Sequence, residues 1–584
     1  MKLFWLNVTR KRNITPFKYI CLIIFLQSCA TNHSQFGSKE PVTIKDNFDN
    51  PKTVSHTFYL VGDAGNADEL KAKQILKLFE ERLKKADTNS TLLFLGDNIY
   101  PLGMPPKDSP DRKTAEEKLN IQLALSKNFK GKTIFIPGNH DWYNGVEGLK
   151  EQERLVNEYL KEKKSFLPRK NCGIDHLNIN DNVALIVIDS QWYLEDWDKH
   201  PTINNDCDIK SREQFFDELE SRLNDNQKKT TILAIHHPLM SNGTHGGEFS
   251  LKKHLFPIEK KIPMPVIGTI INLLRKTSGI SPQDLQNKKY NAFVKRVKTL
   301  IQNRNNVVVV SGHDHNLQYI DKDNIKQIIS GAGSKEEAAR AINENDFSFG
   351  HNGYAVLEVL GNGASKVSYY GADSKGKEGL LYKQQPTFPR PKPNLREYPN
   401  NFPTSKDTSV YTTKMTTKGG AYRFLWGKHY RKIYSTPIKA QSVSLDTLYG
   451  GLTPTISGGG HQSKSLRLVD KDGKEYVMRA LKKSATRFLQ SVAFKDQSVE
   501  KDFRDTYAED FIMDFYTTAH PYTPFIVSEL ADRVGISHSN PKLFYVPKQN
   551  RQALFNKEYG DELYMIEERP MSAFKDLKSF GKPD

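Results

Sequence analysis

The pattern that most constrains the fold lies between about Thr57 and Tyr370, where short apolar runs alternate with helical segments. The apolar runs are rich in β-branched residues or leucine and end at Gly, Asp or His, which is typical of buried strands. From Ala67 to Ala86, apolar side chains recur at helical spacing with charges between them. Strands that alternate with helices predict an α/β layered domain. The predicted strands are 56–61, 91–95, 133–136, 183–188, 231–235 and 307–310.

The chain is longer than this pattern, because 584 residues exceed what one hydrophobic core ordinarily serves. We expect the layered domain to span residues 54–372 and a polar tether, residues 30–53, to precede it. A proline-rich run from Gln384 to Pro403 favours extended backbone, so residues 373–410 are predicted to be an interdomain linker.

The last part of the chain, residues 411–584, is expected to be a separate α+β or β-rich region. Strand-like pieces occur at Ser465–Val469 and Glu475–Met478, and a helical piece lies near Asp505–Thr518. No internal repeat and no chemical motif gives this region a function.

The N-terminus has the features of an export signal. Basic residues precede a short apolar run, Ile20–Leu26, which is followed by Gln27-Ser28-Cys29. The run is too short to cross a bilayer as a helix. Its Leu-Gln-Ser-Cys ending resembles a bacterial lipobox, which implies a lipidated Cys29 and a membrane-anchored lipoprotein of the cell envelope, facing the periplasm or the cell surface. The predicted signal peptide of lipoprotein type covers residues 1–29, and the alternative is an ordinary cleaved signal in which Cys29 occurs by chance.

Two cysteines remain when Cys21 and Cys29 are set aside with the leader. An exported protein can form disulfides, so Cys172 and Cys207 are a possible pair that closes a loop of 35 residues. Two free, buried thiols are the alternative.

The formal charge of +17 would suit nucleic acid, an anionic membrane or phosphorylated substrates. The basic residues are spread along the chain, and no nucleic-acid-binding signature accompanies them, so no nucleic-acid partner is expected.

Five short polar motifs directly follow five of the predicted strands. In an open α/β sheet the carboxyl ends of strands form the ligand crevice, so these motifs are expected to converge on one site. Each motif alone is common in turns, but together they offer the Asp, Tyr, Asn and His side chains of a metal site. Structural zinc would instead use a cysteine-rich cluster. The motifs are Gly62-Asp63-Ala64-Gly65, Gly96-Asp97-Asn98-Ile99-Tyr100, Gly138-Asn139-His140-Asp141, His236-His237-Pro238 and Gly312-His313-Asp314-His315.

The motifs resemble those of the purple acid phosphatases, a group of the calcineurin-like metallophosphoesterases, and most closely the small tartrate-resistant acid phosphatases. The resemblance covers about Phe58 to Tyr370 and includes Ser330-Gly331-Ala332-Gly333 after the last motif. It implies a sandwich of mixed sheets flanked by helices and a binuclear metal centre. One metal ion would be held by Asp63, Asp97, Tyr100 and His315, and the other by Asp97, Asn139, His236 and His313.

Tyr100 bears on the identity of the metals, because a phenolate suits trivalent iron. The resemblance therefore implies Fe³⁺ paired with Fe²⁺, Zn²⁺ or Mn²⁺, whereas a Tyr100 that merely packs beside the turn would leave a divalent pair. His140 and His245 are the expected catalytic histidines, which would bind a phosphate oxygen or protonate the leaving alkoxide. His237 is expected to be structural.

The implied activity is hydrolysis of phosphate monoesters, in which a metal-bound hydroxide attacks phosphorus and inorganic phosphate is released. The substrate would be a phosphorylated small molecule or protein. Hydrolysis of phosphodiesters, nucleotides or pyrophosphate on the same site is an alternative. Another is an envelope binding or assembly protein with an accessory phosphatase domain, because residues 450–479 resemble a segment that follows the phosphatase domain in larger bacterial envelope proteins.

A long insertion lies between His245 and His313, and it includes Phe256–Gly279 with the apolar run Ile262–Leu274. It is interpreted as a substrate lid, as an interfacial membrane contact or as a packed helical insertion.

Overall fold

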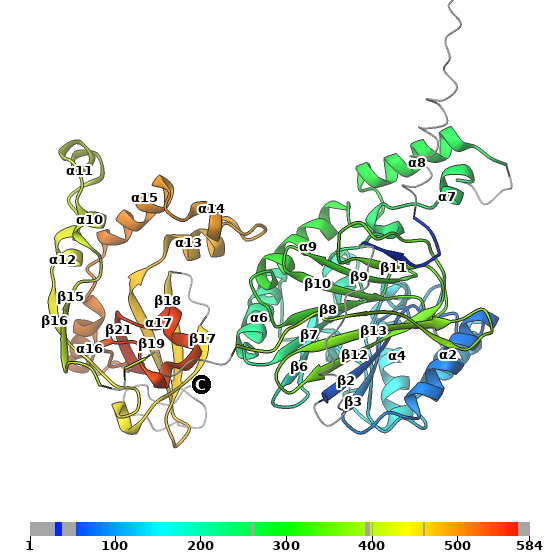
Figure 1. Cartoon of the computed structure of the whole chain (residues 1–584), viewed down its shortest axis with the longest axis horizontal. Helices are drawn as coiled ribbons and strands as arrows, with labels where there is room; N and C mark the ends of the chain where they lie inside the picture. Colours follow the sequence, from blue (N-terminus) through cyan, green and yellow to red (C-terminus); the bar gives the residue numbers. More distant parts are fainter. Residues whose placement is uncertain are drawn as a thin grey trace, which may run out of the picture. The chain divides into compact units, whose positions relative to one another are not determined.

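The computed structural model describes residues 30–37, 54–257, 262–391, 398–399, 401–458 and 462–569. Contacts divide the chain into two compact units, which Figure 1 draws with the sequence coloured from blue to red. The first unit comprises most of the chain up to Phe388, and the second is built mainly from residues after Pro389. The predicted leader with Cys29 lies outside the described residues. Among the helices that are described, none has both the length and the apolar character needed to cross a bilayer.

The first unit contains two mixed sheets. In the six-stranded sheet the order is β14-β13-β12-β2-β3-β4, and β2, β3 and β4 run parallel. These strands are β2 (Val54–Val61), β3 (Ser90–Phe94), β4 (Lys132–Phe135), β12 (Gly353–Leu360), β13 (Ser365–Ala372) and β14 (Glu378–Gln384).

The second, eight-stranded sheet has the order β1-β11-β9-β10-β8-β7-β6-β5, with β6, β7 and β8 parallel at its centre. These strands are β1 (Gln35–Phe36), β5 (Ile174–Asn178), β6 (Val183–Ile188), β7 (Thr230–Ile235), β8 (Val307–Ser311), β9 (Leu317–Lys322), β10 (Ile325–Ser330) and β11 (Phe347–Phe349).

One hydrophobic core joins the two sheets. Phe58 and Leu93 of the six-stranded sheet share a buried cluster with Leu185 and Val310 of the eight-stranded sheet. Figure 1 shows α2 and α4 alongside the six-stranded sheet and α9 alongside the eight-stranded sheet. The predicted layered α/β fold is therefore confirmed. The helices up to the insertion and after it are α2 (Leu70–Leu83), α3 (Arg112–Ala124), α4 (Gly145–Leu160), α5 (Ser190–Leu194), α6 (Arg212–Asp225) and α9 (Lys288–Ile301).

Two segments that were predicted to lie outside the layered domain pack on the first unit. The hairpin partner β14 extends the six-stranded sheet to Gln384, beyond the domain boundary expected at 372, because Asp373 accepts hydrogen bonds from the backbone of Lys375 and Lys377 and turns the chain back onto β13. The beginning of the expected tether is likewise attached to the unit, since β1 pairs with β11.

The insertion folds into two helices, α7 (Leu251–Leu255) and α8 (Pro265–Ser278), which Figure 1 shows beside one another at the edge of the unit. Pro265 stands at the start of α8, where its missing N–H costs nothing, and Gly279 ends the helix in the left-handed conformation.

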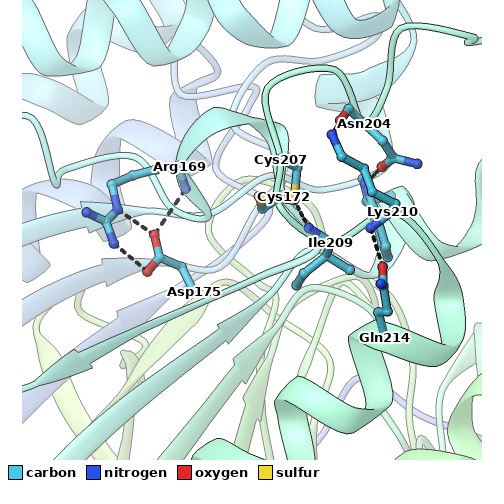
Figure 2. Close-up of a disulfide and its surroundings, with 9 residues drawn as sticks. Arg169, Cys172, Asp175, Asn204, Cys207, Ile209, Lys210 and Gln214 are labelled. Carbon is cyan, nitrogen blue, oxygen red and sulfur yellow. Dashed lines mark hydrogen bonds and ion pairs between the residues drawn. A yellow bond between two sulfur atoms is a disulfide. The ribbon is translucent and has the colours of Figure 1, made fainter. Parts of the chain in front are cut away.

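The structure joins Cys172 and Cys207 in a disulfide (Figure 2). Beside it, the backbone N–H of Ile209 donates a hydrogen bond to Cys207 Sγ, and Arg169 pairs with Asp175 at 2.6 Å.

The second unit is built around an antiparallel sheet of order β17-β18-β19-β21-β20 and a two-stranded ribbon, β15-β16. Leu466, Met478 and Ile566 lie in its core, so the C-terminal region is β-rich as expected. Its strands are β15 (Ser405–Thr408), β16 (Ile438–Gln441), β17 (Thr453–Gly458), β18 (Ser463–Val469), β19 (Glu475–Lys483), β20 (Lys542–Val546) and β21 (Glu562–Glu568). Its helices are α10 (Thr413–Thr416), α11 (Gly420–Trp426), α12 (Arg431–Ser435), α13 (Ala485–Phe488), α14 (Glu500–Phe503), α15 (Tyr507–Phe515), α16 (Thr523–Arg533) and α17 (Asn556–Tyr559).

Candidate metal centre

The five polar motifs lie where β2, β3, β4, β7 and β8 end. Asp63, Asp97 and His313 adopt positive φ angles of 56°, 54° and 72°, so the chain turns sharply as each strand finishes. Such a backbone is uncommon for residues with a side chain and tends to occur at functional sites. The turns aim the three side chains into one buried space, where each is at most 2% exposed.

One group of donor atoms is formed by Asp63, Tyr100 and His315. The Tyr100 hydroxyl lies 2.9 Å from Asp63 Oδ1 and 3.1 Å from His315 Nε2, and His315 Nε2 lies 3.6 Å from Asp63 Oδ1. Two oxygen atoms and one nitrogen atom therefore face the same point.

A second group is formed by Asn139, His236 and His313. Asn139 Oδ1 lies 3.1 Å from His236 Nε2 and 3.2 Å from His313 Nδ1. An amide oxygen and two imidazoles are again a set that binds metal ions.

Asp97 adjoins both groups. Its Oδ1 lies 3.4 Å from His236 Nε2, and it forms a compact cluster of possible ligand atoms with Asp63 and His236, all within 4.8 Å of one another. Asp97 Oδ1 also accepts a hydrogen bond from the backbone N–H of His140 at 2.9 Å, which fixes the carboxylate in place. A carboxylate at this position can bridge two cations.

In His236 and His313 one ring nitrogen is hydrogen-bonded to a backbone carbonyl group. These bonds decide which nitrogen is free to bind a metal ion. His236 Nδ1 lies 2.7 Å from the carbonyl oxygen of Leu95, and His313 Nε2 lies 2.8 Å from that of Gln283. A carbonyl oxygen can only accept, so both of these nitrogens carry the hydrogen. The lone pairs of His236 Nε2 and His313 Nδ1 therefore point toward Asn139, as metal ligation requires.

The protonation of the buried groups fits a cation site. Burial lowers the pKa of His236, lowers that of His313 strongly and brings that of His315 to about 3, so all three rings are neutral at pH 7. Burial and repulsion from Asp97 raise the pKa of the Asp63 carboxyl well above its usual range. Neutral imidazoles bind metal ions, and a bound cation would offset the repulsion between the two carboxylates.

Glycines make the close approach of these loops possible. A Cβ at Gly138 would lie 2.2 Å from Asp97 Oδ1, and one at Gly312 would lie 2.5 Å from Asp63 Oδ2. Neither position can accept a side chain while the two carboxylates stay where they are.

The two histidines expected to be catalytic lie at the edge of the centre. His140 donates from Nδ1 to the carbonyl oxygen of Pro101, and its Nε2 lies 3.9 Å from Asp97 Oδ2. The His245 ring lies 4.1 Å from the His313 ring, centre to centre. His237, by contrast, is buried with both ring nitrogens hydrogen-bonded, to Ser190 and Gln283, which agrees with the structural role expected for it.

Sequence reasoning missed the groups that hold His245 and His313 from the insertion. Asp284 Oδ1 lies 2.8 Å from His245 Nδ1, and Arg275 of α8 binds both carboxylate oxygens of Asp284 at 2.6 and 2.7 Å. Burial lowers the pKa of His245, but the bond to Asp284 outweighs it and leaves that pKa above its usual value. The adjacent Gln283 supplies the carbonyl group that orients His313. No motif marks these residues, because they follow a helix and not a strand.

Lys335 was also missed. Its Nζ lies 3.3 Å from the centre of the Tyr100 ring, which places a cation beside the first donor group. A lysine among acidic residues in a long loop has no spacing from which this position could be predicted.

Comparisons with known proteins agree with this geometry. Residues 56–317, which include all nine of the predicted metal ligands and catalytic histidines, match the family model for calcineurin-like phosphoesterases. Purple acid phosphatase 3 of Arabidopsis thaliana is 23% identical over 360 residues, which cover 59% of this chain and 80% of that protein.

Two solved structures are similar to this chain over more than half of its length. GAP50, described as the anchor in the inner membrane complex of Plasmodium, is 17% identical, with 57% of this chain and 88% of that one covered and a TM-score of 0.38. A structure of PhoD is 14% identical, with 56% and 67% covered and a TM-score of 0.34. From the family match and the purple acid phosphatase relative, we conclude that residues 56–317 form a calcineurin-like phosphoesterase domain, which makes the chain a metal-dependent phosphoesterase.

Proposed function

We propose that this chain is a phosphomonoesterase with two metal ions in its active site. The observation that carries the proposal is the arrangement of two donor groups around one carboxylate, Asp97. One ion would be held by Asp63, Tyr100 and His315 and the other by Asn139, His236 and His313, with Asp97 shared. When bound, two such ions polarise a phosphoryl oxygen and lower the pKa of water.

The remaining residues fit the steps of ester hydrolysis. His140 Nδ1 donates to the carbonyl oxygen of Pro101, so Nε2 faces the centre and, in the imidazolium form, can donate to a phosphate oxygen. His245 is held at Nδ1 by Asp284, which leaves Nε2 to protonate the departing alkoxide. Lys335 adds positive charge that suits a phosphate dianion.

Turnover of a chromogenic monoester and of the matching bis-ester tests the substrate class. We expect the monoester to be hydrolysed with the higher kcat/KM, because two histidines and a lysine can neutralise its second negative charge. A clear preference for the bis-ester would reassign the site to phosphodiesters and leave the metal centre intact.

Tyr100 supports the further proposal that its metal is ferric iron. A ferric phenolate has a visible charge-transfer band, so protein loaded with iron should be coloured and Tyr100→Phe should lose the band while it retains part of its hydrolytic activity. Colourless iron-loaded protein that is fully active with zinc or manganese would contradict the ferric assignment alone.

We also propose that the protein is a lipoprotein of the cell envelope, anchored at Cys29. The Leu26-Gln27-Ser28-Cys29 sequence and the disulfide both fit an exported chain. Cys29→Ser should block processing and release the protein from detergent-extractable membranes. Processing at a different residue, with unchanged membrane association, would contradict lipidation.

A further inference from the structure

The helix α8 presents an unusual surface to solvent. Val266, Ile267, Ile270, Leu273 and Leu274 are each between 50% and 70% exposed. Of the residues of α8, which are all described, only Gly268 and Asn272 are buried. A helix that is apolar around most of its circumference normally lies in a protein core or against lipid.

Helix α8 contacts the rest of the unit through the side of the helix that carries Gly268. A Cβ at Gly268 would lie 2.1 Å from the carbonyl oxygen of His254 in α7, so the two backbones touch there. This close packing turns the isoleucine and leucine side chains of α8 away from α7. Figure 1 shows α8 running along the margin of the unit and not across the face of a sheet.

Basic residues predominate in the sequence of the α7–α8 segment, although Lys253, Arg275 and Lys276 pair with carboxylates outside it, Glu337, Asp284 and Glu248. Between Leu251 and Gly279 the sequence contains six lysine and arginine residues and one acidic residue, Glu259. An apolar helix face flanked by lysine and arginine is the composition of helices that lie in the interface of an anionic bilayer.

The chain itself enters the unit beside this surface. The backbone N–H of Ala30 donates a hydrogen bond to the carbonyl oxygen of Phe249 at 3.2 Å, and Ala30 forms a β-bridge with Ser250, the residue that caps α7. Adjacent Cα atoms are about 3.8 Å apart, so an acyl group on Cys29 would be attached within one residue of this contact. The proposed anchor and α8 therefore belong to the same edge of the unit.

We propose that the exposed face of α8 docks into the headgroup region of an anionic bilayer, beside the lipid anchor. The apolar side chains enter the acyl boundary, and exposed basic side chains such as Lys252 contact lipid phosphates. Docking fixes the orientation of the domain on the membrane. It also brings the membrane to the helix whose Arg275 holds Asp284 beside His245. The proposal rests in part on the anchor at Cys29, so its test omits that anchor.

The test uses the processed chain from residue 29 with Cys29→Ser, which removes the acyl group, and vesicles of phosphatidylethanolamine and phosphatidylglycerol. We expect this protein to float with the vesicles. Replacing Ile267, Ile270 and Leu274 by serine should lower the partition coefficient by about tenfold or more, since three apolar side chains no longer enter the lipid. Hydrolysis of a soluble monoester should be unchanged, which separates this result from failure of the proposed function.

A control replaces three other exposed apolar residues of the same unit, namely Leu70, Ile342 and Leu380, by serine; each is about half exposed or more. We expect the control to float like the parent protein. Equal flotation of the α8 variant, or no flotation of the parent, would overturn the proposal. A dimer that the α8 variant dissociates would assign the surface to a second copy of the chain, and a lowered unfolding temperature would assign it to another segment of the same chain.

A second measurement uses the lipidated full-length protein on the same vesicles. A polarity-sensitive fluorophore attached at Ile270→Cys should shift to shorter wavelength, whereas the same label at Leu70→Cys should not. Identical spectra at the two positions would overturn the docking of α8 even if the lipid anchor is present.

Discussion

Asp97 is the residue at which the two donor groups meet. Its carboxylate is almost completely buried, close to His236 and to the negative charge of Asp63. Such an arrangement is costly in the absence of cations and becomes favourable when positive charge lies between the carboxylates. The structure therefore ties the position of this side chain to metal binding.

Asp97→Asn should remove one negative charge from the shared position with little change in volume. We expect metal content and monoester hydrolysis to fall together, hydrolysis by at least about 100-fold. Elemental analysis and kcat/KM of the same preparation measure both. Asp108→Asn, an exposed carboxylate of the same unit, is the control. Two metals per chain and near-normal turnover in Asp97→Asn would disprove the bridging role.

The predicted ligands were accessible from the sequence because each follows a buried strand with a recognisable apolar pattern. Asp63, Asn139 and His313 were therefore predicted to converge on one site, although the structure divides their strands between two sheets. Asp284 and Lys335 could not, because loops carry no periodicity that fixes where they lead. Which ring nitrogen of His236 is free likewise depends on a tertiary contact with Leu95.

The insertion between His245 and His313 contributes residues to the candidate metal centre. Its helix α8 supplies Arg275 and the following loop supplies Gln283 and Asp284, so an element added between two histidine motifs orients both His245 and His313. Sequence analysis left a lid, a membrane contact and a packed helix open. The structure shows the helix, but the pattern of apolar residues alone did not reveal how little of it would be buried.

Arg275→Ala should loosen Asp284 and, through it, His245. We expect kcat for a monoester to fall by about tenfold with little change in metal content, because Asp284 contacts no ligand atom of the two donor groups. Lys276→Ala, the next residue of α8, pairs with Glu248 at the surface and serves as the control. Equal kinetics of the two variants would show that Asp284 does not need its arginine.

The Cys172–Cys207 disulfide links the segment after α4 to the segment before α6 in the first unit. It closes a loop of 35 residues. Cys207→Ser should therefore destabilise that unit by about 3 to 4 kcal/mol. Urea unfolding followed by the fluorescence of tryptophan measures the change, with the Cys172→Ser, Cys207→Ser double variant as the check for a stray thiol. An unchanged midpoint in both variants would show that the bridge contributes nothing.

The whole molecule consists of two units, and every predicted ligand and catalytic histidine lies in the first. The expected N-terminal limit, residue 54, is the first residue of β2, but β1 and Ala30, in the expected tether, also pair with this unit. The six-stranded sheet continues beyond the expected limit at 372 into β14, where only Tyr382 and Gln384 are buried, so this strand lacks the continuous apolar run by which a buried strand is recognised in sequence. Neither the sequence nor the described structure of the second unit contains a motif that indicates its role.

A chain that ends at Phe388 should keep its metal ions and its monoesterase activity to within about threefold, since no residue of the centre lies beyond that point. Metal analysis and steady-state kinetics on the truncated protein measure this. Loss of hydrolysis in a folded, metal-loaded truncation would show that the C-terminal region takes part in catalysis.

The central claim is that two metal ions share Asp97 in one phosphoesterase site. Its most direct test is the metal content of full-length protein purified without added metal, measured by elemental analysis alongside monoesterase activity before and after chelation. We expect two transition-metal ions per chain, loss of activity when they are removed and recovery when they are restored. Protein that retains full activity with fewer than two ions per chain would contradict it.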